Sequence, residues 1–206
     1  IDPQGSLTTM FGYTPETEFQ GGGNIYDAIR YEDPVPMREV IRKTYFPNLD
    51  LAAAGLVLAE FEHETPRALH VRREPMFFKR LGLAIDQVEA DYDIVVIDCP
   101  PQLGFLTMSA LIAATTVLIT VIPSMLDIAS MNQFLQMTAG LLNVVASYGA
   151  SLEYDNLKFL ITRFEPSDGP QAQMAGFLRA LFAEQVMTNT FLKSTAVSDA
   201  GLTQQT

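Results

Sequence analysis

Apolar runs and helical repeats alternate along the chain. Residues 94–97 are all apolar and β-branched, a pattern typical of a strand buried on both faces of a parallel sheet. Residues 115–122 and 157–162 have a similar character and predict two further buried strands. Shorter candidate strands are residues 48–53 and 186–192. The chain therefore carries the apolar strands that a parallel sheet needs at its centre.

Apolar residues recur at helical spacing between these runs. Phe77, Leu81 and Ile85 are spaced four residues apart, which gives a helix one apolar face. This spacing predicts a helix over residues 74–90, immediately before the strand at 94–97. Similar patterns and capping residues predict helices at residues 6–11, 24–30, 35–43, 56–63, 105–114, 128–145 and 174–182, and a last helix start at 198–199.

The order of these elements predicts an α/β fold. Strands that alternate with helices are typical of a doubly wound, mostly parallel sheet with helices on both faces. No internal repeat, low-complexity segment or linker divides the sequence, so we expect a single domain over residues 1–206. The chain opens on Ile1 and ends at Thr206 without recognisable terminal signals. We therefore interpret it as a fragment truncated at both ends.

Composition narrows the classes of function. Hydrophobic residues make up 48% of the chain, enough for a substantial core. The net charge of −11 argues against a protein that reads duplex DNA by bulk electrostatics, although a local basic patch is compatible with it. A single cysteine excludes an internal disulfide. No apolar run approaches the roughly 18 residues of a membrane span, and no signal peptide is visible.

Two acids stand where predicted strands end. Asp98 follows the strand at 94–97, and Pro100 and Pro101 then prevent the sheet from continuing, because proline donates no ladder hydrogen bond. Asp2 is predicted at the end of another strand. Each acid alone is as readily a turn or capping residue as a ligand. Together at one sheet edge they suit a magnesium–phosphate site.

The phosphate-binding loop of such a site is missing from the sequence. The pattern G-x-x-x-x-G-K-[ST] does not occur in the 206 residues. The residues by themselves therefore predict an α/β domain with an incomplete nucleotide or phosphate site. His63 lies among glutamates and is better explained by a solvated acidic face than by a metal site. Cys99 is better explained as a small packing residue than as a nucleophile.

Several segments resemble one family in both content and order. Residues 1–8, Ile-Asp-Pro-Gln-Gly-Ser-Leu-Thr, resemble the second nucleotide motif of ParA-type partition ATPases. Residues 92–101, which end in Asp-Cys-Pro-Pro, resemble the Walker B strand of that family. Residues 159–164 resemble its later strand, whose end lies beside the nucleotide base. Residues 125–131 and 193–201 resemble the RepA branch of repABC replicons, so the resemblance covers nearly the whole chain.

The resemblance implies a P-loop NTPase-like fold whose first strand–P-loop–helix unit is missing here. The family's deviant loop, K-G-G-x-G-K-[ST], lies roughly 30 residues before the first motif. It implies that the intact parent binds ATP and Mg²⁺ and is an ATP hydrolase. The fragment lacks the loop's lysines, so its own activity is uncertain and we expect it to bind ATP poorly.

The resemblance also implies roles for individual residues. Asp2 is the catalytic residue that positions the attacking water, and Asp98 holds Mg²⁺ through water. The implied nucleotide-binding or switch residues are Pro3, Gln4, Pro100, Pro101, Gly104, Thr162 and Arg163. Thr162 is as readily a plain strand end, and Arg163 a surface ion-pair residue. The candidates for a local DNA-binding patch are Arg163, Arg179 and Lys193, with Arg30 as a further possibility.

The family's partners follow from the same resemblance. It implies a homodimer formed with ATP, non-specific DNA binding and a ParB- or RepB-like centromere-binding protein. The acidity predicts that DNA binding is weak and gated. The expected location is the bacterial cytoplasm at the nucleoid, without membrane. Two alternatives stay open: a non-enzymatic regulatory or interaction module that keeps the fold, and a MinD-like ATPase that reaches the membrane through a terminal amphipathic helix.

Overall fold

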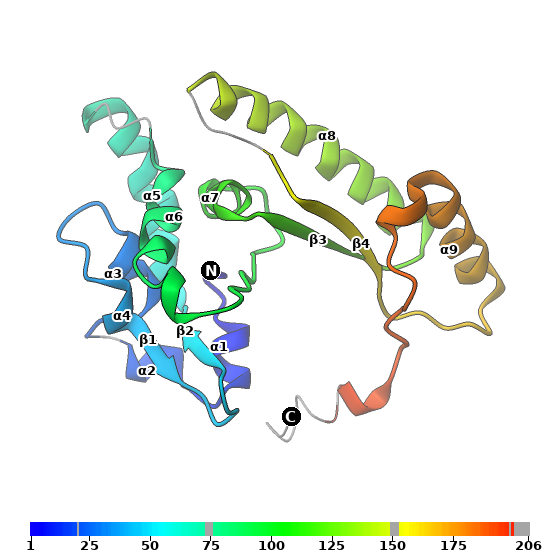
Figure 1. Ribbon diagram of the computed structural model, residues 1–206, viewed down its shortest axis with the longest axis horizontal. Coiled ribbons are helices and arrows are strands. Elements are labelled where there is room, and N and C mark those ends of the chain that lie inside the picture. The colour runs from blue at the N-terminus through cyan, green and yellow to red at the C-terminus, as the bar shows by residue number, and fades with distance from the viewer. Residues whose placement is uncertain (20, 73–75, 149–152, 198, 200–206) are drawn as a thin grey trace. The chain divides into compact units, whose positions relative to one another are not determined.

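The computed structural model in Figure 1 describes residues 1–19, 21–72, 76–148, 153–197 and 199. The chain divides into two compact units, Ile1–Ala114 (unit 1) and Thr115–Thr206 (unit 2). The expectation of one domain over residues 1–206 stays a prediction. The helix start expected at residues 198–199 and the beginning of the helix expected at 74–90 fall partly outside the described residues.

Unit 1 consists of short helices and a small antiparallel hairpin. Its α-helices are α1 (Ser6–Met10), α2 (Pro15–Glu18), α3 (Ile25–Ile29), α4 (Met37–Val40), α5 (Ala59–Arg67), α6 (Lys79–Asp86) and α7 (Phe105–Ala113), and its shorter helical segments are η1 (Leu56–Leu58), η2 (Ala68–Arg72) and η3 (Glu89–Asp91). Val40, Leu58 and Phe61 are fully buried in the core between them. The helices predicted at 24–30, 56–63 and 105–114 are confirmed as α3, η1 with α5, and α7.

Local sequence signals explain several of these helices. Asn24 caps α3 by accepting a hydrogen bond of 2.9 Å from the Tyr26 backbone nitrogen. Asp27 completes a capping box by accepting from the Asn24 nitrogen at 3.2 Å. In α6 the apolar face is present as predicted, with Leu81 and Ala84 buried. The helix is shorter than predicted and ends at Asp86.

The helix predicted at 35–43 is wrong beyond Val40. Residues Ile41–Lys43 form strand β1, which pairs antiparallel with β2 (Asp50–Ala52) in the register Ile41 to Ala52. The hairpin decides the conformation because each residue of β1 gains a ladder partner, which a short helix cannot offer. The strand expected at 48–53 is confirmed over the three residues of β2.

The strand predicted at 94–97 is also wrong as a buried strand. The segment belongs to no ladder among the described residues, and Ile94 and Val96 are 78% and 86% exposed. A central strand of a parallel sheet has neighbouring strands on either side, and the described residues of unit 1 supply none for this segment. Its last residue, Ile97, and Tyr92, two residues before its start, do pack on the core.

A hydrogen bond fixes the start of this segment. The Tyr92 hydroxyl donates to Asp50 Oδ2 at 2.7 Å, and Lys43 Nζ reaches the same oxygen at 2.8 Å. The hydrogen bond to the Asp50 carboxylate raises the pKa of Tyr92 to about 12, with desolvation adding to it. The bonds from Lys43 and then Tyr92 lower the pKa of Asp50. The hairpin thus anchors the chain just before the acid motif at Asp98.

Unit 2 contains a parallel strand pair. Strand β3 (Thr116–Val121) pairs with β4 (Asn156–Ile161) over six residues each, and Figure 1 shows α8 (Met125–Ser147) running alongside them. Unit 2 also contains α9 (Gly169–Phe182) and η4 (Ala183–Gln185). The strands predicted at 115–122 and 157–162 and the helices at 128–145 and 174–182 are therefore confirmed.

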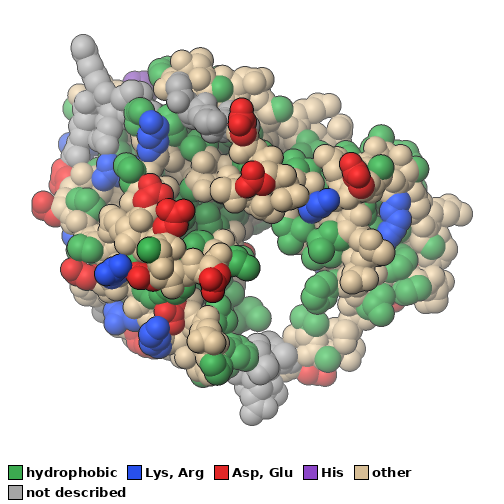
Figure 2. All heavy atoms as spheres, viewed as in Figure 1, with side chains coloured by type: hydrophobic (Ala, Val, Ile, Leu, Met, Phe, Trp, Pro, Cys, Tyr) green, Lys and Arg blue, Asp and Glu red, His purple; other side chains and the backbone are tan. Residues whose placement is uncertain are grey.

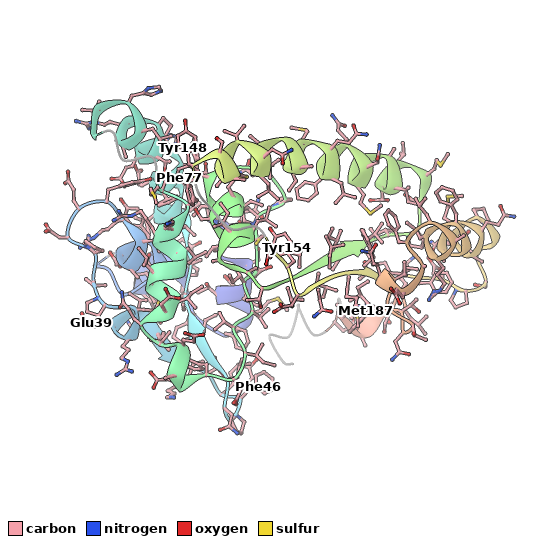
Figure 3. The ribbon with its side chains drawn as sticks, turned by 45° about the horizontal axis from the view of Figure 1, so that its top comes forward. Glu39, Phe46, Phe77, Tyr148, Tyr154 and Met187 are labelled. Atoms are coloured by element: carbon pink, nitrogen blue, oxygen red, sulfur yellow. The ribbon has the colours of Figure 1, made fainter. Side chains whose placement is uncertain are left out.

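One face of this strand pair carries the core of unit 2. Phe159 and Ile161 share an apolar cluster with Met131 of α8 and Leu178 of α9. Residues of β3 alternate between this face and solvent, and Leu118 is 51% exposed, so the strand predicted as buried at 115–122 is buried on one face and exposed on the other. Single parallel bridges join Phe159 to Val186 and Phe164 to Leu192. The strand expected at 186–192 is thus present only as two bridges, with Met187, labelled in Figure 3, just after the first.

Candidate functional site

The two acid motifs lie next to each other in unit 1. The Ile1 nitrogen donates a hydrogen bond of 2.7 Å to the Asp98 carbonyl oxygen, so residues 1–2 run beside residue 98. The charges of Asp2 and Asp98 both act on the Cys99 thiol. Two acids that are 96 positions apart in sequence are thus brought to one place, as their resemblance to paired nucleotide motifs implies. Their roles there stay predictions.

Asp2 begins a tight turn. Its Oδ1 accepts the Gln4 backbone N–H at 2.9 Å, and its carbonyl accepts the Gly5 N–H at 3.0 Å. Gly5 has a φ of 66°, in the left-handed region that favours glycine. A Cβ at Gly5 would lie 2.9 Å from the Ala54 carbonyl oxygen, so the turn sits directly against the buried residue Ala54 just after β2. One carboxylate oxygen of Asp2 is therefore engaged in the turn, and Oδ2 is left for other contacts.

Buried Thr8 holds the same turn from the helix side. Its Oγ1 donates to the Ala54 carbonyl at 2.9 Å and accepts the Ala54 N–H at 2.9 Å. Only 1% of Thr8 is exposed, so both bonds are shielded from water. The residues after Asp2 are thereby fastened to unit 1 by backbone contact and by a paired hydrogen bond.

Gly5→Ala is expected to destabilise the protein by about 1–3 kcal/mol, because a Cβ meets both a left-handed φ and the Ala54 oxygen. The matched control is Gly12→Ala, which has a φ of 84° but no atom within 4 Å of its Cβ. Thermal unfolding of both variants measures the difference. An equal loss of stability in the two would show that the contact with Ala54 contributes nothing.

The Asp98 side chain is open to solvent. Among the described residues no hydrogen bond or ion pair engages its carboxylate, whereas Pro100 two positions later is buried. Mg²⁺ prefers carboxylate oxygens and retains several waters, so a free, exposed carboxylate fits a water-mediated contact. The described part of the chain gathers no group of three or more His, Cys, Asp or Glu side chains that could enclose a metal. The residues present therefore fit a hydrated ion better than a caged one.

Cys99 is a poor nucleophile in this setting. Desolvation of the thiol raises its pKa although the residue as a whole is exposed; the positive charge at the Ile1 nitrogen opposes this increase, and the Asp98 and Asp2 carboxylates add to it. Its Sγ contacts the Ile97 carbonyl oxygen at 3.6 Å. A raised pKa lowers the thiolate fraction at neutral pH, which agrees with the interpretation of Cys99 as a packing residue.

The loop from Pro100 to Gly104 leads into α7 and is held by a residue that the sequence patterns did not single out. Glu62 of α5 accepts the backbone N–H groups of Phe105 at 2.9 Å and Leu106 at 2.8 Å. Gly104 is the N-cap of α7 and has no side chain for capping. The sequence does show that α7 starts without a capping side chain. It does not show that Glu62, 42 positions before Gly104, accepts the hydrogen bonds that a cap would accept.

The other predicted site residues lie in unit 2. The Thr162 N–H donates to the Val121 carbonyl at 2.9 Å, and Arg163 follows β4 with a φ of 52°. Lys193 pairs with Glu165 at 2.7 Å, and Arg179 donates to the Thr188 carbonyl at 3.1 Å. Two of the three DNA candidates are thus engaged within their unit. The roles of these residues stay predictions.

The visible surface offers limited support for a basic patch. In Figure 2 the Lys and Arg side chains on the unit 1 face in view are mixed with Asp and Glu. Arg30 of unit 1, for example, donates to the Asp33 carbonyl and lies 3.6 Å from Asp27. The described residues include no helix both long and apolar enough to cross a membrane.

A family model and several curated relatives match this chain. The family model of an AAA domain matches residues 1–146. The chain is 54% identical to a putative replication protein A from Rhizobium rhizogenes and 49% identical to one from Sinorhizobium fredii, over 100% of this chain and 52% and 51% of those proteins. It is 29% identical to the chromosome partitioning protein ParA of Caulobacter vibrioides, over 97% of this chain and 69% of that protein. The chain thus spans about half the length of the replication proteins it matches.

Solved structures agree on the fold. An ATP complex of McdA from Cyanothece is similar with a TM-score of 0.79 at 16% identity, covering 99% of this chain and 74% of that one. Cobyrinic acid a,c-diamide synthase from Mycobacterium smegmatis, with bound ADP and magnesium, has a TM-score of 0.75 at 23% identity, covering 98% and 75%. These likenesses place the chain in the P-loop NTPase-like α/β fold.

Proposed function

This chain belongs to the ParA-type branch of the AAA domain family, and we propose that its parent protein is an ATP-dependent partition ATPase. ATP drives dimerisation and non-specific DNA binding, and a ParB- or RepB-like centromere-binding protein stimulates hydrolysis. The observation that carries the proposal is the meeting of the two acid motifs, where the Ile1 nitrogen lies 2.7 Å from the Asp98 carbonyl oxygen. Acids with separate structural roles would not need their two motifs to be adjacent.

Each acid has a separate task in this proposal. Asp98 accepts hydrogen bonds from the waters of a Mg²⁺ ion through its free, exposed carboxylate. The ion supplies charge that stabilises the phosphates during transfer. Asp2 uses Oδ1 to hold its own turn at Gln4, which leaves Oδ2 to orient the attacking water. Pro3 and Gln4 shape that turn, and Pro100, Pro101 and Gly104 shape the loop that senses the γ-phosphate.

DNA binding in this proposal is gated by dimerisation. The chain carries a net charge of −11, so a monomer repels the DNA backbone. Two copies joined around ATP double any local patch, to which Arg163 is the best-placed contributor because Lys193 and Arg179 are engaged within unit 2. Binding of this kind weakens steeply with salt concentration. Thr162 and Arg163 are proposed to lie near the base or the dimer face.

Asp98→Asn in the full-length protein is expected to lower Mg²⁺-dependent ATP turnover by about 10- to 100-fold, the usual cost of losing an outer-shell metal partner. The amide keeps the shape of the side chain and removes its charge. Phosphate release is measured with DNA and the centromere-binding partner present. Asp93→Asn, at an exposed acid in the same segment, is the matched control and is expected to behave as wild type. Equal turnover by Asp98→Asn and wild type would remove Asp98 from the site.

A further inference from the structure

An acid on α5 occupies the N-terminus of α7. The first N–H groups of any helix have no partner within the helix and need an outside acceptor. Glu62 meets this need with both carboxylate oxygens, since Oε2 accepts from Phe105 at 2.9 Å and Oε1 from Leu106 at 2.8 Å. A carboxylate with two charge-assisted hydrogen bonds also interacts favourably with the positive end of the helix dipole. The contact joins residues that are more than 40 positions apart within unit 1.

Gly104 is the residue that makes room for this contact. A Cβ built there would lie 2.5 Å from Glu62 Oε1, closer than real side chains approach. The backbone of Gly104, with φ −115° and ψ −169°, is extended and open to any residue. The glycine is therefore explained by the space that the carboxylate occupies rather than by conformational freedom. Glu62 and Gly104 form one fitted pair, which we call the α7 tether.

The tether restrains a short loop on both sides. Residues 100–104 span the distance from Asp98 to α7, and two prolines restrict their backbone. Within the loop, the Gln102 carbonyl accepts from Thr107 Oγ1 at 2.7 Å and from the Gly104 N–H at 3.2 Å. The prolines and these hydrogen bonds restrict the backbone torsions between Asp98 and α7. The position of α7 relative to α5 therefore sets where the loop lies.

The tether also has a rigid base. Phe61, next to Glu62 on α5, is fully buried and stacks on Tyr31 with ring centroids 5.6 Å apart. On the other side Leu106 is 1% exposed, and Phe105 packs edge-to-face on Phe77, labelled in Figure 3, at 5.0 Å. Both partners of the hydrogen bonds are thus fixed by core packing. A contact between two fixed elements can hold a loop, whereas one between mobile side chains cannot.

We propose that Glu62 is a positioning residue for ATP hydrolysis, which holds the Pro100–Gly104 loop through the α7 tether so that Asp98 and the loop face the phosphates. This inference rests on the proposed function. Glu62 acts through the loop and touches no nucleotide. Its loss is therefore expected to slow the chemical step more than it weakens ATP binding, so that kcat falls and KM for ATP stays unchanged.

Glu62→Gln tests the tether directly. The amide preserves size, but its NH₂ group faces a backbone donor, so one hydrogen bond and the charge are lost. Hydrogen exchange of the peptide that contains Phe105 and Leu106 is expected to speed up by about tenfold, the usual scale for one lost charge-assisted bond. In the full-length protein kcat is expected to fall by about tenfold at constant KM. Glu60→Gln, two residues earlier on the exposed side of α5, is the control and changes neither quantity.

A second variant links the two halves of the tether. Gly104→Ala is expected to displace the Glu62 carboxylate and to give the same faster exchange and lower kcat. In the Glu62→Gln background the same substitution is expected to add less than half of its effect in wild type, because the contact is already weakened. Fully additive effects on kcat would overturn the inference that Gly104 acts through Glu62.

Different results would contradict the positioning role of Glu62 and the proposed ATPase function. Faster exchange in Glu62→Gln with an unchanged kcat, in a protein that hydrolyses ATP, would overturn the positioning role and leave the ATPase function intact. Unchanged exchange would show that there is no tether to break. Absence of turnover in wild type would instead contradict the proposed function, and the exchange measurement, which needs no nucleotide, would still report on the contact itself.

Discussion

Asp2→Asn is expected to lower the stimulated ATP turnover of the full-length protein by about 100-fold or more, the scale for removing a group that orients or activates a reacting water. The amide retains Oδ1 as acceptor for the Gln4 N–H, so the turn that positions Gly5 is preserved. Stability should therefore change little, and the loss should appear in kcat. Single-turnover phosphate release with DNA and the centromere-binding partner measures it.

The control for this prediction is an acid of the same unit without a proposed role. Asp86→Asn, at the exposed C-terminal residue of α6, removes the same charge far along the chain from the motif. It is expected to leave turnover within twofold of wild type, because Asp86 lies outside both acid motifs and the loss of an acid at a helix C-terminus does not destabilise the helix. If Asp2→Asn retained wild-type turnover while remaining folded, the role of Asp2 in orienting water would be wrong.

Phe61→Ala is expected to destabilise the protein by about 3–5 kcal/mol, since truncation of a fully buried aromatic ring leaves a cavity in the core. The ring stacks on Tyr31 and shares its cluster with Leu58 and Leu106. Denaturant unfolding measures the loss. Because Phe61 precedes Glu62, the variant should also loosen the α7 tether and speed exchange at Phe105.

Leu56→Ala provides the comparison for core truncation. Leu56 lies in η1, a few residues before Phe61, and is 70% exposed. Its truncation removes little buried surface and is expected to change stability by no more than about 0.5 kcal/mol. A loss at Leu56 comparable to that at Phe61 would contradict the placement of the core, because burial would then fail to distinguish the two sites.

Helices were the part of the fold most readily predicted. The repeat of Leu81 and Ile85 in α6, the Asn24 cap of α3 and the long apolar pattern of α8 each depend on residues within a few positions of one another. Such local signals determine where a helix starts and which face is apolar. Their exact ends were less predictable, because tertiary contacts decide the last turn, as at Val40 where β1 takes over.

Strand burial could not be predicted in the same way. The run Ile94–Val96 has the composition of a central strand, yet it joins no ladder with the described residues of unit 1, and two of its side chains are more than three-quarters exposed. Whether a strand is buried depends on neighbours that are distant in sequence. The same reason applies to Leu118 in β3, where the helices of unit 2 contribute to the core on one face and leave the other open.

In the candidate site, too, residues in local motifs were predicted and residues defined by long-range contacts were missed. Asp2 and Asp98 were found because each sits in a recognisable motif, and the structure places the motifs side by side. Glu62 was missed because its role depends on a hydrogen-bonded contact with Phe105 and Leu106 that leaves no local pattern. Gly104 was assigned to the loop for its resemblance to a switch, whereas its contact with Glu62 supplies the physical reason for a glycine.

The most direct test of the account is ATP turnover by the wild-type full-length protein with Mg²⁺, measured alone, with DNA, and with DNA and the centromere-binding partner. The account predicts phosphate release that requires Mg²⁺, is slow for the protein alone and is fastest when both DNA and partner are present. Phosphate release no faster than a protein-free blank in all three conditions would contradict it.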